Sequence, residues 1–147
     1  MRIAIVGPLS RDEATTLLDV GRDQLPIGYP GAPFLSTLAS RIEELDHEVS
    51  FVTTSVGIDS PISLSSKTRK IEVTFVPQRS HSFRFNGMTP GRSLDFFRQE
   101  RKGLCRALSS CKPDIVNAHW TYEFALAAIE SGFPNLITCH DVPRAVL

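Results

Sequence analysis

The chain has 147 residues, 41% of them hydrophobic, and its 16 Lys and Arg balance its 16 Asp and Glu. This length and apolar content are enough for one domain with a hydrophobic core, and they exclude a disordered chain. A formal net charge of zero excludes bulk electrostatic attraction to nucleic acid as the basis of function. Partners therefore have to be inferred from local sites.

The compartment is indicated by the first residues and by the cysteines. The apolar run in "RIAIVG" after Met1 is too short for a signal peptide, and no later segment approaches about 18 apolar residues. Cys105, Cys111 and Cys139 are odd in number and lack C-x-x-C spacing, as expected in a reducing compartment. We expect a cytoplasmic protein whose only membrane contact would be peripheral.

Five short runs rich in β-branched and apolar residues predict strands. These runs are residues 2–7, 48–54, 71–77, 114–119 and 135–141. Apolar residues at helical spacing predict helices between several of them. The predicted helices are residues 34–45, 94–108 and 122–131.

The third predicted helix has recognisable ends. Thr121 is placed to cap its start, and Gly132 suits the left-handed residue after its end. Because strands alternate with helices along the chain, we expect parallel pairing and right-handed crossovers. The predicted fold class is α/β, a Rossmann-like doubly wound sheet in three α/β/α layers, formed by residues 1–147 as one domain.

Three connections do not fit the simplest alternation. The polar segment 57–70, "GIDSPISLSSKTRK", predicts a loop with a short helical turn. Segments 8–30 and 77–93 are predicted loops, and both exceed the usual length of about 2–6 residues for a βα connection. Loops of that length are usually functional or mobile.

Polar residues follow two of the predicted strands. His119 and Trp120 end the fourth strand, and His140 and Asp141 end the fifth. In an open parallel sheet, ligands bind beyond the carboxyl ends of the strands. We therefore expect these residues and the turn at 28–33, which precedes the first predicted helix, to meet at one edge.

Gly28 and Gly31 lie in that turn, "GYPGAP". Glycines before a helix let backbone N–H groups approach an anion, and the helix N-terminus adds about half a positive charge. A phosphate is the natural ligand for such a turn. A Pro/Gly turn without a ligand is the alternative.

An ordered set of motifs resembles a known family. The glycine-bearing turn, "LASRIEELDHEVSFVTT", "KPDIVNAHW" and "PNLITCHD" together resemble the N-terminal domain of GT-B glycosyltransferases, most closely the retaining family 4. The resemblance spans nearly the whole chain in the same order. It implies a donor diphosphate near Gly28 and Gly31, and a transferred sugar near His140, which would act in catalysis.

The resemblance also implies an incomplete active site. In such enzymes the N-terminal domain mainly shapes the acceptor site, and a C-terminal GT-B domain, to which no motif here corresponds, holds most nucleotide-sugar contacts. The expected acceptor contacts in this chain are His119, Trp120, Glu123, Asp141, Arg79, Arg84 and Arg92. No cofactor is implied. A metal site from the two histidines and Asp141 is not supported by any H-x-H or H-x-x-x-H spacing.

Several of these residues have a second explanation. Glu123 lies in the first turn of its predicted helix, where the dipole stabilises a carboxylate without any ligand. Segment 77–93 contains Arg79, Arg84 and Arg92 and no acidic residue. It is either a solvated loop or a surface for an anionic acceptor or a membrane.

We therefore expect the N-terminal half of a retaining glycosyltransferase, which moves a sugar from a nucleotide-sugar donor to an unidentified acceptor. The chain alone is expected to be inactive. The alternative is a non-catalytic Rossmann-like binding domain that partners a separate donor-binding chain. An NAD-dependent dehydrogenase ranks below both, because "IVGPLS" lacks G-x-G-x-x-G after the first strand.

Overall fold

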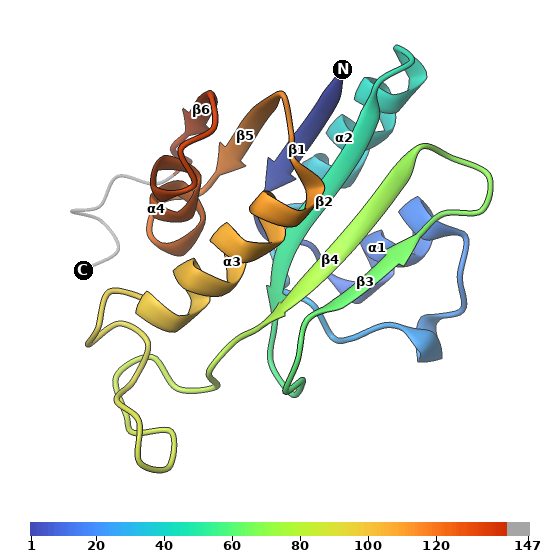
Figure 1. The fold of residues 1–147 in the computed structure, drawn as a ribbon. Helices are drawn as coiled ribbons and strands as arrows, with labels where there is room; N and C mark the ends of the chain where they lie inside the picture. Colours follow the sequence, from blue (N-terminus) through green and yellow to red (C-terminus); the bar gives the residue numbers. More distant parts are fainter. Residues whose placement is uncertain (141–147) are drawn as a thin grey trace.

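A computed structural model describes residues 1–140 of the chain. They form a six-stranded sheet in the order β3-β4-β2-β1-β5-β6, in which β3 runs antiparallel to β4 and all other neighbours are parallel (Figure 1). The strands are β1 (Arg2–Val6), β2 (Glu48–Ser55), β3 (Ile62–Ser65), β4 (Ile71–Pro77), β5 (Ile115–His119) and β6 (Asn135–Thr138).

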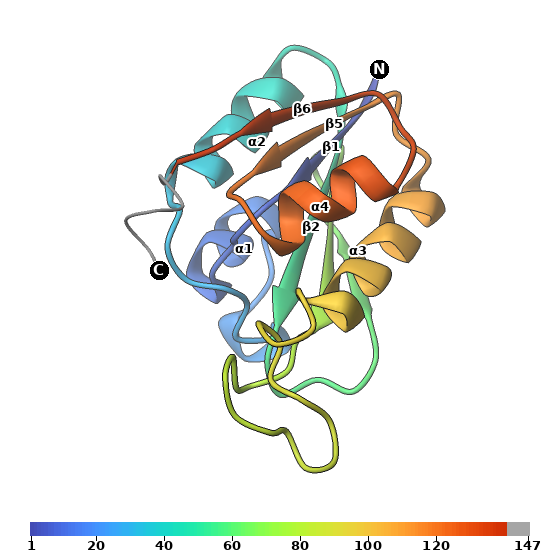
Figure 2. The same ribbon diagram turned by 90° about the vertical axis from the view of Figure 1, so that its left-hand side faces the viewer.

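Helices cover both faces of the sheet in the described part of the chain. Figure 2 shows α1 and α2 on one side of the strands and α3 and α4 on the other. The helices are α1 (Arg11–Leu18), α2 (Phe34–Glu44), α3 (Arg98–Cys111) and α4 (Glu123–Glu130), with a short 3-10 helix, η1 (Arg22–Gln24). The predicted α/β class with a mostly parallel sheet is confirmed, and the arrangement is compatible with a Rossmann-like fold.

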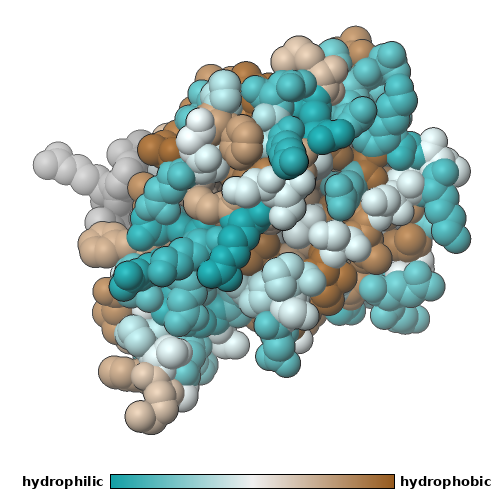
Figure 3. All heavy atoms as spheres, in the orientation of Figure 1, coloured by the Kyte–Doolittle hydropathy of each residue, from teal (hydrophilic) through white to brown (hydrophobic). Residues whose placement is uncertain are grey.

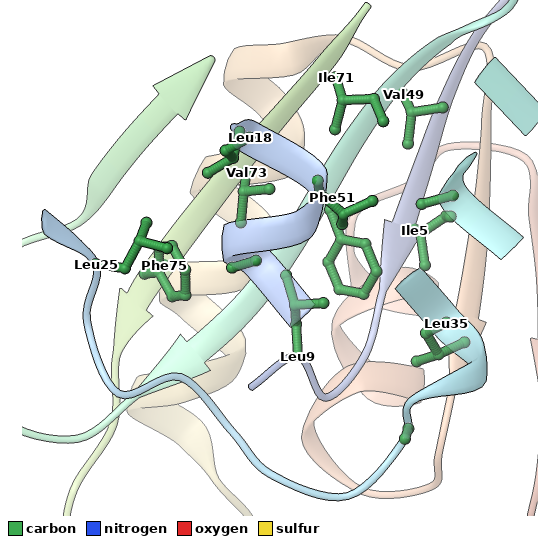
Figure 4. Packing of buried hydrophobic residues seen from close by; sticks show 14 residues of the cluster. Ile5, Leu9, Leu18, Leu25, Leu35, Val49, Phe51, Ile71, Val73 and Phe75 are labelled. Atoms are coloured by element: carbon green, nitrogen blue, oxygen red, sulfur yellow. The ribbon is translucent and has the colours of Figure 1, made fainter. Parts of the chain in front are cut away.

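Two hydrophobic cores lie on opposite faces of the sheet because successive strand residues point to opposite sides. Ile5, Phe51 and Phe75 pack with Leu17 of α1 and Leu35 of α2 in the first core, part of which Figure 4 shows. All five side chains are fully buried. Burying a Leu, Ile or Phe side chain contributes about 1.5–3 kcal/mol, so this layer is a main source of stability.

The second core joins α3 and α4 to the other face. Val6, Val52 and Val116 of the three central strands pack with Leu104 of α3 and Phe124 of α4. The helices α3 and α4 also contact each other. Both cores together hold the sheet rigid beneath the loops at its carboxyl edge.

The segment after β2 is a strand, so the prediction of a loop with a helical turn over residues 57–70 is wrong. Ile62–Ser65 pairs antiparallel with β4 at the edge of the sheet. Its alternation is weak, with Leu64 packing against the first core while the Ser63 hydroxyl lies 2.8 Å from the Thr74 hydroxyl. The strand has four residues, two of them serine, so its apolar periodicity was too weak to predict a strand from the sequence.

The long predicted loop at 8–30 contains α1, and this prediction is also wrong. Ser10 and Glu13 form a capping box, in which the Ser10 side chain accepts from the Glu13 N–H and the Glu13 side chain accepts from the Ser10 N–H. Leu17 and Leu18 are fully buried. Because the β2–β4 connection runs through β3 and contains no helix, α1 takes the place of a crossover helix against β4.

Two predicted helix starts differ from the structure. The helix predicted from Leu94 begins at Arg98, since Phe96 and Phe97 have positive φ values of 52° and 57° and cannot be helical. The next helix begins at Glu123 with Tyr122 as its N-cap residue, and no side chain caps it. Gly132 has a φ of 76°, so its predicted left-handed conformation is confirmed.

The predicted cap at Thr121 is wrong, because the hydroxyl of that residue is buried without a partner among residues 1–140. The last strand, predicted over residues 135–141, ends at Thr138, so the prediction that His140 ends a strand is wrong: it lies two residues beyond. Within the same residues, no helix is both long enough and apolar enough to span a bilayer.

Candidate functional site at the carboxyl edge of the sheet

The sheet has a topological switch point between β1 and β5. The chain leaves β1 towards α1 and α2 on one face, whereas β4 and β5 are followed by α3 and α4 on the other. Connections therefore diverge at the carboxyl ends of β1 and β5, where ligands bind in open α/β sheets. His119 is the last residue of β5.

The two histidines predicted at this edge are in contact. His119 is opposite Thr138 in the β5–β6 register, and His140 lies two residues further on, so their side chains share a face. The Nδ1 of His119 lies 3.0 Å from the Nε2 of His140, and the rings are nearly parallel, at 15°. His119 is buried at 5% exposure, whereas His140 is exposed.

Two aromatic side chains flank the pair. Phe34, the first residue of α2, lies with its ring centroid 5.7 Å from His119 and 5.0 Å from His140. Trp120 lies 6.1 Å from His140. Phe34 begins the helix predicted over residues 34–45, and 44% of it is exposed. In the sequence, only its position directly after the glycine turn indicated that Phe34 lies at this edge.

Burial, and then the neighbouring His140, lower the pKa of His119 below its usual value. His119 is therefore neutral at pH 7, and its ring can only donate one hydrogen bond and accept one. Its Nε2 is buried without a partner among the described residues. A buried polar atom left unpaired is costly and is often explained by a ligand, an ion or water.

The connection between β5 and α4 is conformationally strained. Trp120 and Tyr122 have positive φ values of 81° and 62° without being glycine. Such residues cost on the order of 1–3 kcal/mol each and persist where the surroundings hold them, frequently at functional sites. The Trp120 N–H donates to the Thr138 carbonyl at 3.1 Å, which fixes this turn against the end of β6.

The two glycines of the predicted phosphate turn differ in their surroundings. The Gly28 N–H donates to the Ser55 hydroxyl at 3.0 Å, so this amide is already used. A Cβ at Gly28 would lie 2.2 Å from the Leu9 carbonyl oxygen, which explains the glycine by packing. Gly31 is exposed, with no atom within 4 Å of a built Cβ. The following helix, α2, has no side-chain cap, and the Leu35 N–H in its first turn donates to the Ala32 carbonyl at 3.0 Å.

Glu123 is buried beside the same edge, at 2% exposure. Burial raises the pKa of its carboxyl group to about 7, while its own backbone N–H and Arg92 act in the opposite direction. Burial, and then the charge of Glu123, raise the pKa of Tyr29, whose ring packs edge-on against Phe124. Glu123 thus lies beneath the surface, out of direct contact with solvent.

The three predicted acceptor arginines have separate environments. The Arg79 guanidinium bonds to Asp95 and to the buried Glu100, and is itself 8% exposed. Arg92 donates to the Arg79 and Ser80 carbonyls at 2.6 and 2.9 Å. These two side chains hold the loop together, which gives them a structural role in place of the predicted ligand contact.

Arg84 is exposed and makes no ion pair with any described residue. Asp141, the remaining predicted contact, lies outside the described residues. In the part of the chain that the structure describes, no group of three His, Cys, Asp or Glu side chains is arranged to hold a metal ion.

Two grooves lie away from this edge. One, of about 410 Å³, runs between β4 and α3 and is lined by Thr74, Gly103 and Arg106 among others. The other, of about 480 Å³, surrounds the amino ends of β2 and β4, near Arg2 and Lys70. Neither groove is lined by His119 or His140. The candidate site is therefore identified from the arrangement of side chains at the switch point.

The fold and this edge define an α/β protein with a Rossmann-like sheet and a histidine pair at its switch point. Comparison of the chain with protein-family models, with curated proteins and with solved structures gave no match.

Proposed function

We propose that this chain is the acceptor-side, N-terminal half of a retaining GT-B glycosyltransferase that uses a nucleotide-sugar donor. The observation that carries the proposal is the His119–His140 contact beside the uncapped N-terminus of α2 at the switch point. Together these features offer imidazole nitrogens for sugar hydroxyls and a positive helix end for phosphate. The motif resemblance supplies the particular reaction.

The two histidines have different proposed roles because His119 is buried and His140 is exposed. His119 is buried and neutral, so it orients His140 through the 3.0 Å contact. The exposed His140 then meets the transferred sugar and hydrogen-bonds a hydroxyl group or the charge that develops during transfer. The positive end of α2, together with Gly31, attracts the donor phosphates.

The proposed reaction requires few carboxylate groups from the protein. In a retaining transfer of this class, the donor's own diphosphate can assist the acceptor. The protein then orients the acceptor and stabilises the leaving group, and both tasks use positioned hydrogen bonds. A C-terminal GT-B domain would supply most donor contacts, and no metal or other cofactor takes part in the proposal.

The test is a nuclear magnetic resonance titration of the 147-residue chain with uridine and guanosine diphosphate sugars. We expect weak binding that shifts the signals of His119, His140 and Trp120. His140→Ala should weaken binding about three- to ten-fold, the value of one hydrogen bond, and leave the melting temperature within a few degrees. His47→Ala is the matched control, because His47 precedes β2 at the opposite edge.

Equal affinity of His140→Ala and the unmodified chain would contradict the proposal. So would ligand-induced shifts confined to the two grooves near α3 and the amino ends. Binding by the chain, without sugar transfer in any assembly with a donor-binding domain, would favour the non-catalytic binding domain.

A further inference from the structure

The loop between β4 and α3, residues 78–97, exposes an unusual amount of apolar surface. Five of the eleven large hydrophobic side chains that are exposed in the described chain lie in it. They are Phe83 (73% exposed), Phe85 (67%), Met88 (97%), Leu94 (54%) and Phe96 (74%). The loop projects from the body of the protein in Figures 1 and 2, and apolar spheres mark its tip at the lower left of Figure 3.

Ion pairs and hydrogen bonds within the loop keep these apolar side chains exposed. At the base, Arg79 bonds to Asp95 and Glu100. Further out, the Asn86 side chain accepts from the His81 N–H at 2.8 Å and donates to the His81 carbonyl at 3.1 Å. These bonds hold the apolar side chains outward.

Close backbone packing adds to this frame. A Cβ at Gly91 would lie 2.2 Å from the Ser82 carbonyl oxygen, so only glycine allows the two halves of the loop to approach. Exposed apolar area costs about 25 cal/mol per Å² relative to burial, and contiguous patches of it usually mark an interaction site.

The charge of the loop indicates which kind of partner it would bind. Its only acid, Asp95, shares the Arg79 guanidinium with the buried Glu100. Arg84 lies between Phe83 and Phe85, and Arg98 directly follows the loop; both are exposed and form no ion pair with a described residue. Aromatic side chains on both sides of the unpaired Arg84 suit the interface of an anionic bilayer, where rings enter the headgroup layer and a guanidinium group binds phosphates.

We propose that the β4–α3 loop is a membrane-docking element that inserts Phe83, Phe85 and Met88 into an anionic lipid surface, with Arg84 on the lipid phosphates. The inference goes beyond the proposed function and does not depend on it. Docking through this loop leaves the carboxyl edge, from which the loop extends, beside the membrane surface.

The test is co-sedimentation of the chain with vesicles of phosphatidylcholine alone and of equal parts phosphatidylcholine and phosphatidylglycerol. The unmodified chain should bind only the anionic vesicles. The double variant Phe83→Ser/Phe85→Ser should bind them about ten-fold or more weakly, because the inserted apolar area is lost. Arg84→Gln should weaken binding about three- to ten-fold at low salt, and this deficit should shrink as salt rises.

Leu45→Ser and Arg41→Gln are the controls, since both side chains are exposed at the other edge of the sheet. They should bind like the unmodified chain, and all variants should keep its melting temperature because the changed side chains face solvent. Absence of binding to anionic vesicles at low salt, or unchanged binding by the double variant, overturns the proposal. A dimer in solution that the double variant dissociates would assign the loop to a protein contact and also overturn it. Neither outcome involves a nucleotide sugar, so a failure here is separate from a failure of the proposed function.

Discussion

At the scale of single residues, the carboxyl edge combines an exposed imidazole with buried titratable groups. His140 is open to solvent, whereas His119 and Glu123 are 5% and 2% exposed. Burial favours the neutral form of each, which lowers the pKa of the imidazole and raises that of the carboxyl group. The edge is therefore less charged at neutral pH than its sequence indicates.

The raised pKa of Glu123 predicts a pH-dependent stability. Its folded pKa of about 7 exceeds the ordinary 4.5, so the folded state keeps a proton that the unfolded chain has released. Stability is lost as pH rises from about 4.5 to 7 and is then constant, a loss on the order of 3 kcal/mol. Urea unfolding across this range should show the loss in the unmodified chain and not in Glu123→Gln.

Glu44→Gln, at an exposed position of α2, is the control for that experiment and should leave the pH dependence of the unmodified chain in place. Parallel curves for Glu123→Gln and the unmodified chain would mean that Glu123 titrates normally in the folded protein.

At the scale of elements, the loop between β4 and α3 depends on one buried ion pair. The Arg79 and Glu100 side chains are 8% and 1% exposed, and Glu100 also accepts from the Arg79 N–H at 3.0 Å. Arg79→Met would leave a buried carboxylate without its partner, which costs about 3–5 kcal/mol. Urea unfolding at pH 7 measures this loss.

The exposed pair Arg41–Glu44 supplies the comparison, because surface ion pairs contribute about 0–1 kcal/mol. Arg41→Met should therefore change the free energy of unfolding little. If Arg79→Met were no more destabilising than Arg41→Met, the ion pair would not be what holds the loop. Adding Glu100→Gln to Arg79→Met should restore part of the lost stability.

The second prediction at this scale concerns α1. Leu17 is fully buried in the first core, so Leu17→Ala should lower the free energy of unfolding by about 2–5 kcal/mol. Leu45→Ala, at a position 71% exposed, should change it by less than about 0.5 kcal/mol. Similar unfolding curves for the two variants would indicate that α1 does not pack against β4 in solution.

At the scale of the whole molecule, the candidate site is an open edge. Ligand pockets typically bury about 70–90% of a small ligand, and such burial requires walls on several sides. The histidine pair, Phe34 and the start of α2 provide one wall. The proposed function therefore requires a second domain to close over the donor.

This openness predicts that the 147-residue chain alone transfers no sugar. A donor-consumption assay with nucleotide sugars and a mixture of sugar and lipid acceptors should show no turnover above buffer. Calorimetry on the same preparation should detect weak donor binding at most. Tight binding together with turnover would show that these residues form a complete active site and would refute the half-site proposal.

The sequence by itself determined the order of the main strands and helices and the place of His119 at the end of β5, with His140 shortly after β6. Those features depend on local periodicity, which reports which face of an element is buried. It also indicated the carboxyl edge as the ligand-binding side, because parallel strands share that edge. The glycine turn was correctly placed before α2, although Gly28 proved to be held by packing against Leu9 and by Ser55.

Only the tertiary structure decided the rest. The short β3 exists because β4 offers an edge to pair with, and α1 covers β4 because the β2–β4 connection has no helix. The His119–His140 and Arg79–Glu100 contacts each join residues 21 positions apart. No local pattern encodes such pairs, because the distance between their side chains is set by strand register and loop path. Long-range geometry therefore decides which of the predicted polar residues lie at the carboxyl edge and which hold the fold together.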